Sequence, residues 1–427
     1  MSQGERIAIT GGRLIDPHHA IDDSLDLFID GEHICGIETP PAGFSADREI
    51  DATGLWVIPG LIELGANLPD DQPEALARHT RTAAAGGITT LCLAPDMQPC
   101  LDGPASIELV HARAQRHGCV RLVTLGALTR ELAGEQLSEL GALREAGCVG
   151  VSNGRQPVTD TRIMRRAMEY AASHELSVFV HARDPWLTAG GCVHEGELST
   201  RLGLPGIPAA AETIAVAREL ALAELTGAQL HFCRLSTAES VDMVRRARAS
   251  GLAVSADVAI HHLLLSDSDI EPFDSRYRID PPLRSSADRE ALLAGLVDGV
   301  ISAVCSDHRP VSRDARQQPF PAAGAGIAGL HTLLALMLGL VHEGHLTPAD
   351  LVRLASTSPA QLLGLPQGQL GNGQVADLCL LDPLQPWTPC EANSAEHCAL
   401  GSPFHNTPLR GRVIHTFVGG QEVYSQT

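Results

Sequence analysis

The chain has no long apolar run and no excess of positive charge. Nothing in its 427 residues approaches the roughly 18 to 20 consecutive apolar residues that a membrane-spanning helix needs. Residues 1–10 lack the cationic start and apolar segment of a secretion signal. Lys and Arg number 31 against 51 Asp and Glu, a formal net charge of -20, which disfavours nucleic acids and anionic membranes. We therefore expect a soluble protein whose partners are small molecules or other proteins.

The sequence also lacks several motifs of nucleotide and metal binding. Its 11 cysteines are scattered singly, without a Cys-x-x-Cys pair, which predicts reduced thiols in the cytoplasm. Most of these cysteines are expected to serve as small apolar core residues. No Gly-x-Gly-x-x-Gly follows the first predicted strand and no Gly-Lys-Ser/Thr occurs, so nucleotide binding has no support.

Both ends of the chain have the pattern of short β-strands. Apolar and β-branched residues in segments 6–14 and 25–37 surround Asp30-Gly31, a dipeptide typical of a tight hairpin turn. An apolar run at 376–381 and two short runs within 412–424 repeat the pattern near the other end. We predict one small β-sandwich domain built from residues 1–55 and 371–427.

The segment between these ends alternates apolar runs with helical periods. Eight alternations favour an α/β fold, a TIM-like (β/α)₈ barrel over residues 56–370, rather than an open doubly wound sheet. The predicted strands are 55–64, 87–94, 121–128, 148–151, 176–181, 229–235, 252–257 and 300–306, and the clearest predicted helices are 72–85, 159–174, 209–226 and 237–249.

Six segments, in order along the chain, resemble the dihydroorotases of the amidohydrolase superfamily. They are residues 59–63 (PGLIE), 85–90 (AGGITT), 145–150 (EAGCVG), 280–284 (DPPLR), 306–308 (SDH) and 406–408 (NTP). In that family one or two divalent metals at the barrel mouth polarise a carbonyl and make hydroxide from water. The resemblance implies metal ligands at the C-terminal ends of the strands, where barrel enzymes keep their chemistry.

The family's ligands are a His-x-His pair after strand one, an Asp or a carbamylated Lys at strand four, single His residues after strands five and six, and an Asp after strand eight. In this chain His181 matches the ligand after strand five, and Asp307 matches the ligand after strand eight. The other positions correspond to Gly65, Asn67, Asn153 and Arg234.

None of these four residues is a good zinc ligand. Glycine has no ligand atom, an amide oxygen is a poor partner for zinc, and a guanidinium only donates hydrogen bonds. We therefore expect no zinc and no other cofactor, with Arg234 replacing the metal as a fixed cation beside His181 and Asp307. If Arg234 faces the lumen, strand alternation turns Cys233 away from it.

The positions that hold substrate in the family differ as well. The family's carboxylate-binding Arg corresponds to Pro69, and its Asn after strand two corresponds to Asp96, which places a negative charge where an anionic pyrimidine acid would sit. Like charges at contact in a partly dry site repel by several kcal/mol, an order-of-magnitude figure. The pair His261-His262, similar to a substrate-loop histidine of the family, is expected to be packed or solvated polar surface.

Three functions remain open at this point. The resemblance is to inactive dihydroorotase-like chains that assemble with aspartate transcarbamoylase in some bacteria, which implies a noncatalytic subunit, oligomeric within a mixed assembly. A metal-poor or metal-independent amidohydrolase with an altered substrate is the second hypothesis. A sensor that binds a small molecule at the barrel mouth without turnover is the third.

Overall fold

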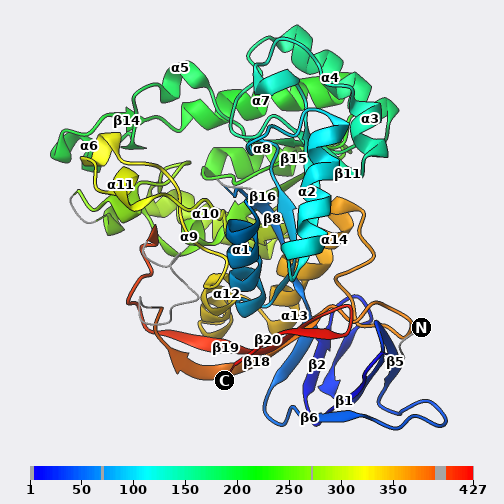
Figure 1. Ribbon diagram of the computed structural model, residues 1–427. Helices are drawn as coiled ribbons and strands as arrows, with labels where there is room; N and C mark the ends of the chain where they lie inside the picture. The colour runs from blue at the N-terminus through cyan, green and yellow to red at the C-terminus, as the bar shows by residue number, and fades with distance from the viewer. Residues whose placement is uncertain (1–3, 69–71, 271–272, 390–400, 427) are drawn as a thin grey trace.

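Eight parallel strands form the central sheet of the protein, and they run in sequence order around it (Figure 1). The computed structural model describes residues 4–68, 72–270, 273–389 and 401–426. The strands are β8 (Leu61–Ala66), β9 (Ile88–Leu93), β10 (Arg121–Ala127), β11 (Cys148–Ser152), β12 (Val178–Val180), β15 (Leu230–Phe232), β16 (Val254–Ala259) and β17 (Ala303–Cys305). Each of these strands overlaps a predicted strand and extends at most two residues beyond it. The predicted barrel is therefore confirmed.

The barrel strands are apolar because both faces of the sheet are covered. Every residue of β9 is buried, as expected of a parallel strand that has side chains of the lumen on one face and helices on the other. The first and last strands, β8 and β17, approach each other and nearly close the barrel. Glu63 connects them, since its carboxylate accepts hydrogen bonds from the Ser306 N–H at 2.9 Å and the Gly65 N–H at 3.4 Å.

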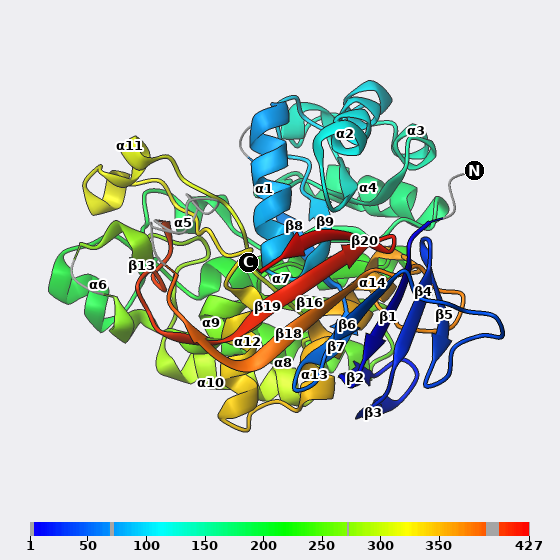
Figure 2. The same ribbon diagram turned by 60° about the horizontal axis from the view of Figure 1, so that its bottom comes forward.

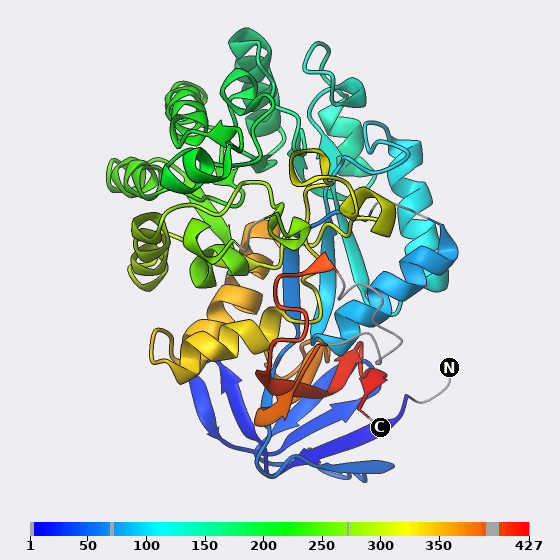
Figure 3. The same cartoon turned by 90° about the vertical axis from the view of Figure 1, so that its left-hand side faces the viewer.

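Helices surround this sheet on its outer side (Figure 3). The four predicted helices are present as α1 (Pro73–Ala85), α4 (Thr161–Ser173), α7 (Ala210–Thr226) and α8 (Ala238–Ala249). Asp160 caps α4 by accepting the N–H groups of Arg162 and Ile163, and Thr237 caps α8 in the same way through Ser240. The longer helices are α1 (Pro73–Ala85), α2 (Pro104–His117), α4 (Thr161–Ser173), α7 (Ala210–Thr226), α8 (Ala238–Ala249), α10 (Ser286–Val297) and α12 (Leu333–His342). Shorter helices are α3 (Leu140–Glu145), α5 (Pro185–Thr188), α6 (Glu197–Leu202), α9 (Ile260–Leu264), α11 (Arg313–Arg316), α13 (Pro348–Val352) and α14 (Ser358–Leu363).

Strands from both ends of the chain form two further sheets beside the barrel (Figure 2). One contains β1 (Arg6–Thr10), β4 (Leu27–Asp30), β5 (His33–Ile37) and β6 (Arg48–Asp51). The other contains β2 (Arg13–Asp16), β3 (Ile21–Ser24), β7 (Trp56–Pro59), β18 (Leu378–Trp387), β19 (Leu409–Val418) and β20 (Gln421–Ser425). One apolar cluster joins the two sheets, from Ile7 and Ile29 to Leu380 and Phe417, so they pack as a sandwich.

The predicted first barrel strand, 55–64, is divided between the two parts of the molecule. Its first half is β7, which pairs antiparallel with β18 and parallel with β2 in the six-stranded sheet. Only its second half, β8, belongs to the barrel. The expected boundary after residue 55 therefore precedes a strand of the terminal sheet. Both halves are apolar and buried, which is why the sequence did not separate them.

Two expectations from composition can be compared with the structure. Within the described ranges, no helix combines the length and apolar character needed to cross a bilayer. The cysteines of those ranges are all free thiols, and six of them are buried, as expected for small apolar core residues.

Candidate functional site at the barrel mouth

The predicted site residues follow the C-terminal ends of the barrel strands. Parallel strands place these ends on one side, so residues far apart in the sequence meet at the mouth of the barrel. The residues in question are Gly65 and Asn67 at the end of β8, Asp96 after β9, Asn153 after β11, His181 after β12, Arg234 after β15 and Asp307 after β17. Pro69 lies outside the described residues.

Arg234 and Asp307 form a buried ion pair at the mouth. The Arg234 Nε lies 3.3 Å from the Asp307 Oδ1, and the two side chains are 8% and 1% exposed. Burial alone lowers the pKa of a guanidinium, but the negative charge of Asp307 outweighs it and raises the pKa of Arg234 above its ordinary value. A fixed positive charge therefore lies beside Asp307 at the mouth.

Gly65 is the residue that makes room for Arg234. A Cβ atom built on Gly65 would lie 2.8 Å from the Arg234 Nη1, closer than side-chain atoms normally approach a Cβ. The guanidinium therefore occupies the space in front of position 65, where the family has a metal-binding histidine. A side chain at position 65 would therefore require the Arg234 guanidinium to move.

The backbone of Arg234 has a conformation that sequence alternation does not anticipate. Its φ is 57°, in the left-handed region that residues other than glycine rarely adopt. This break in the extended backbone lets Arg234 reach the mouth while Cys233 packs in the barrel interior with Ile62, Leu64 and Cys92. The expectation that Cys233 points away from the lumen was therefore wrong, because β15 ends at Phe232 and strict alternation stops there.

Arg155 also belongs to the mouth, although no motif in the sequence pointed to it. Its guanidinium forms a short ion pair with the Asp307 Oδ1 and a hydrogen bond to the Asp280 backbone oxygen. Asp280 in turn accepts a hydrogen bond of 2.9 Å from Arg183. Burial alone would raise the pKa of Asp280, but the surrounding positive charges, including Arg155 and Arg183, hold it below its ordinary value. Asp307 and Asp280 are thus each paired with arginine side chains at the mouth.

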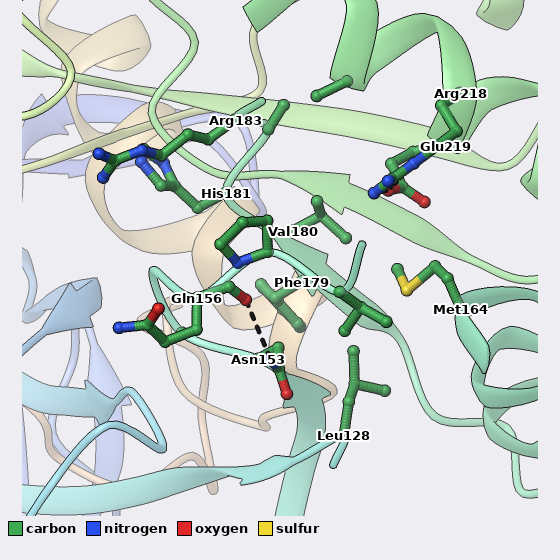
Figure 4. A pocket seen from close by; sticks show the side chains of 15 residues that line it. Leu128, Asn153, Gln156, Met164, Phe179, Val180, His181, Arg183, Arg218 and Glu219 are labelled. Atoms are coloured by element: carbon green, nitrogen blue, oxygen red, sulfur yellow. Dashed lines mark hydrogen bonds and ion pairs between the residues drawn. The ribbon is translucent and has the colours of Figure 1, made fainter. Parts of the chain in front are cut away.

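His181 is buried beside this network and has no hydrogen-bond partner at its Nδ1. Burial, with the positive charges of Arg234 and Arg155, holds the pKa of His181 well below its usual range, so the imidazole is neutral. Figure 4 shows His181 and Arg183 extending together from the end of β12. The small cavity that His181 lines there has a volume of about 20 Å³, room for roughly one water molecule.

Asn153 and Asn67 use their side-chain amides in contacts between loops, whereas Asp96 takes part through its backbone carbonyl and its Oδ1 has no hydrogen-bond partner. The Asn153 amide donates to the Gln156 carbonyl at 2.9 Å (Figure 4). It also donates to the Leu132 carbonyl at 3.1 Å and accepts from the Thr129 hydroxyl at 2.7 Å. Asn153 therefore holds the loops after β10 and β11 together. The Asn67 amide donates to the Asp96 carbonyl at 3.4 Å, which connects the loops after β8 and β9.

The pair His261-His262 is packed and is not solvated surface. Both residues lie on α9 and are fully buried, with exposures of 0% and 1%. Burial lowers the pKa of His262 to about 4. Neither ring nitrogen of His261 has a hydrogen-bond partner, so this imidazole is a neutral packing element near Arg155 and Arg234.

The donors at the mouth do not fit a divalent metal. Two guanidinium groups already neutralise Asp307, and His181 is the only imidazole among the compared positions. The sequence contains no lysine at any position, so a carbamylated lysine is excluded.

One cluster of potential metal ligands lies deeper in the barrel. Among the described residues, only His231, Cys233 and Asp257 bring three ligand atoms within 4.8 Å of one another. Their atoms are engaged otherwise, because His231 bonds Asp257 at 3.0 Å and Asp257 accepts the Arg234 N–H at 2.7 Å. Burial raises the pKa of the Cys233 thiol to about 12, which keeps it protonated.

The fold and the position of the site define a barrel of the amidohydrolase type. The solved structure of L-hydantoinase (dihydropyrimidinase) from Arthrobacter aurescens superimposes with a TM-score of 0.86, covering 98% of this chain and 96% of that one at 23% identity. Dihydropyrimidinase from Brevibacillus agri gives a TM-score of 0.83 at 22% identity, covering 98% of this chain and 95% of that one. At these identities the likeness shows the fold alone.

The chain belongs to the dihydroorotase-like family. A family model described as dihydro-orotase-like matches residues 54–240. A dihydroorotase-like protein of Pseudomonas aeruginosa is 43% identical over 97% of this chain and 98% of its own length. A protein named dihydroorotase from Geobacter sp. (strain M21) is 42% identical over 98% of this chain and 99% of its own length.

Proposed function

We propose that this protein is a noncatalytic dihydroorotase-like subunit that assembles with aspartate transcarbamoylase and supports its structure in pyrimidine biosynthesis. The observation that carries the loss of catalysis is the Arg234 guanidinium, which fills the space before Gly65 and pairs with Asp307. A metal bound there would need Asp307 as a ligand, but Asp307 is already held by two arginines. The partner is inferred from the resemblance to inactive chains of this kind.

Metal analysis tests the noncatalytic part of the proposal. We expect purified protein to contain well under one equivalent of tightly bound zinc and to hydrolyse no dihydroorotate. A related active dihydroorotase, purified in the same buffers, is the control for metal lost during purification. One or two zinc ions per chain together with turnover of dihydroorotate would overturn the proposal.

Co-expression tests the structural part. The transcarbamoylase chain of the same organism would be produced with and without this protein, and particle mass and carbamoyl transfer would be measured. We expect a larger particle that contains both chains, with full transferase activity only in their joint presence. A transcarbamoylase that is full-sized and active alone, and that stays separate from this chain at micromolar concentration and low salt, would remove the subunit hypothesis.

One observation favours a sensor as the second candidate. Polar atoms without partners gather at the mouth, among them the His181 Nδ1, the Asp307 Oδ2 and the Asp96 Oδ1. Buried polar atoms are usually paired, so these atoms are free to bind a small polar molecule. Binding of orotate or carbamoyl aspartate in calorimetry, without turnover and without association with the transferase, would support the sensor.

A further inference from the structure

A cavity of about 350 Å³ lies at the opposite end of the barrel from the mouth. Its lining comes from the N-terminal ends of strands, with Ser177 before β12, Gln229 before β15, Val254 at the start of β16 and Ser302 before β17. Gln229 and Ala253 are exposed, so the cavity opens to solvent, and His231 lies at its buried end. The volume is at the lower end of the range of roughly 300–1,000 Å³ found for ligand pockets.

Three polar side chains form a line that begins in this cavity. His231 and Ser255 are paired neighbours on β15 and β16, and the Ser255 hydroxyl lies 2.8 Å from the His231 Nδ1. The His231 Nε2 lies 3.0 Å from the Asp257 Oδ2. Asp257 is two residues beyond Ser255 on β16, so both side chains face the barrel interior.

The protonation of the line follows from Asp257. Burial alone would raise the pKa of Asp257, but the hydrogen bond from His231 and the charge of Arg234 hold it below its ordinary value, so the group is a carboxylate. A carboxylate can only accept, so the proton of a neutral His231 lies on Nε2. Its Nδ1 is then an acceptor and receives the Ser255 O–H.

We propose that Ser255, His231 and Asp257 form a nucleophilic site that cleaves small esters, separate from the barrel mouth and independent of the proposed subunit function. Ser255 Oγ attacks the ester carbonyl carbon and forms a C–O bond, while its proton passes to the His231 Nδ1. The bond from that carbon to the alkoxy group then breaks, and the alcohol leaves with the proton from Nδ1. Water enters, the same steps release the carboxylic acid, and Ser255 is restored. Asp257 is a positioning residue that holds the imidazole tautomer.

The lining indicates the substrate class. Phe179, Leu230 and Leu362 supply an apolar wall, and the lining contains no acidic residue. The Oε1 of Gln229 accepts the Ser177 hydroxyl at 3.1 Å, so these two side chains add polar groups to the lining. Arg248 also lines the cavity, with its guanidinium hydrogen-bonded to the Gly299 and Val300 carbonyls, so the volume and lining suit short-chain esters that carry no positive charge.

The chain offers a matched control in the same cavity. Ser302 also lines it, but its hydroxyl donates to the Ala256 carbonyl at 3.1 Å and to no imidazole. The full-length protein would be treated with diisopropyl fluorophosphate, and the labelled residue identified by mass spectrometry. In this reaction the Ser255 oxygen forms a bond to phosphorus, fluoride leaves, and the proton goes to His231. We expect one label, on Ser255, retained in Ser302→Ala and lost in Ser255→Ala.

Two further measurements complete the test. Ser255→Ala should lower the protein-dependent hydrolysis of 4-nitrophenyl acetate by at least about tenfold, whereas Ser302→Ala should not. Asp257→Asn should remove a strongly downfield imidazole proton resonance that the wild type and Ser302→Ala both show. Circular dichroism would establish that each variant is folded. No incorporation in the wild type, or equal incorporation in Ser255→Ala, would overturn the proposal.

Discussion

Gly65 and Arg234 depend on each other sterically, and Arg234 and Asp307 depend on each other electrostatically. The guanidinium stands between a glycine with no side chain and a carboxylate that is 1% exposed. A side chain at 65 would displace the guanidinium, and loss of Arg234 or Asp307 would leave a buried charge with fewer partners. This mutual dependence gives the residue-scale predictions.

Histidines placed at positions 65 and 67, where the family has its His-x-His pair, should not create a metal site. In the double variant Gly65→His and Asn67→His, the new Cβ at 65 would meet the Arg234 Nη1. We expect no dihydroorotate hydrolysis and a loss of stability of about 1–3 kcal/mol, typical of an overpacked interior. Zinc content, turnover and urea unfolding would be measured, with Asn67→His alone as the control that adds no Cβ. Measurable hydrolysis by the double variant would show that the mouth is less altered than we infer.

The ion pair itself can be measured with a double-mutant cycle. Arg234→Met leaves the buried Asp307 with Arg155 as its remaining partner, which should cost roughly 2–4 kcal/mol of unfolding free energy. Adding Asp307→Asn removes the charge that lost its partner, so the double variant should be more stable than Arg234→Met. Urea denaturation of the wild type, both single variants and the double variant gives the coupling energy. Additive losses would mean that the two residues do not stabilise each other.

At the scale of elements, the junction of β8 and β17 depends on one carboxylate. Glu63 is fully buried and accepts N–H groups from the ends of both strands. Burial raises the pKa of Glu63 from 4.5 to about 7, despite those hydrogen bonds. The barrel is therefore closed by a group that changes charge near neutral pH.

The stability of the protein should fall as this group ionises. The folded protein binds the Glu63 proton more tightly than the unfolded chain, so its contribution is fully present below pH 4.5 and is lost as the pH rises through about 7. The difference between the two pKa values, 4.5 and about 7, corresponds to about 3 kcal/mol of unfolding free energy. The unfolding free energy of the wild type minus that of Glu63→Gln should decrease by this order between pH 4.5 and 7.5. The exposed substitution Glu175→Gln is the control, and an equal pH dependence in both variants would contradict the assignment to Glu63.

For the whole molecule, net charge bears on association. A protein with a formal charge of -20 is attracted to basic surfaces, and dissolved salt screens this attraction so that its range becomes shorter. If aspartate transcarbamoylase is the partner, we expect the association rate to fall as NaCl rises from about 50 to 500 mM, with a smaller change in the dissociation rate. Stopped-flow light scattering would measure both rates. An association rate that does not change with salt would mean that charge plays no part in the encounter.

The sequence alone predicted the barrel, the approximate positions of its strands, and a glycine and an arginine at two positions where the family has metal ligands. Alternating apolar runs and helical periods are local patterns, and a glycine at 65 or an arginine at 234 lacks a metal-binding atom whatever surrounds it. The hairpin at Asp30-Gly31 is local as well, since β4 and β5 pair across it. These predictions needed no knowledge of distant contacts.

Only the tertiary structure decided which residues meet. Arg155 reaches Asp307 across 152 positions of sequence, and Asn153 turns its amide to neighbouring loops instead of the mouth. Membership of β7 in the terminal sheet and the alignment of Ser255 with His231 both follow from which strands pair and in what register. Pairing and register are set by packing between segments far apart in the chain, and local residue patterns do not contain that information.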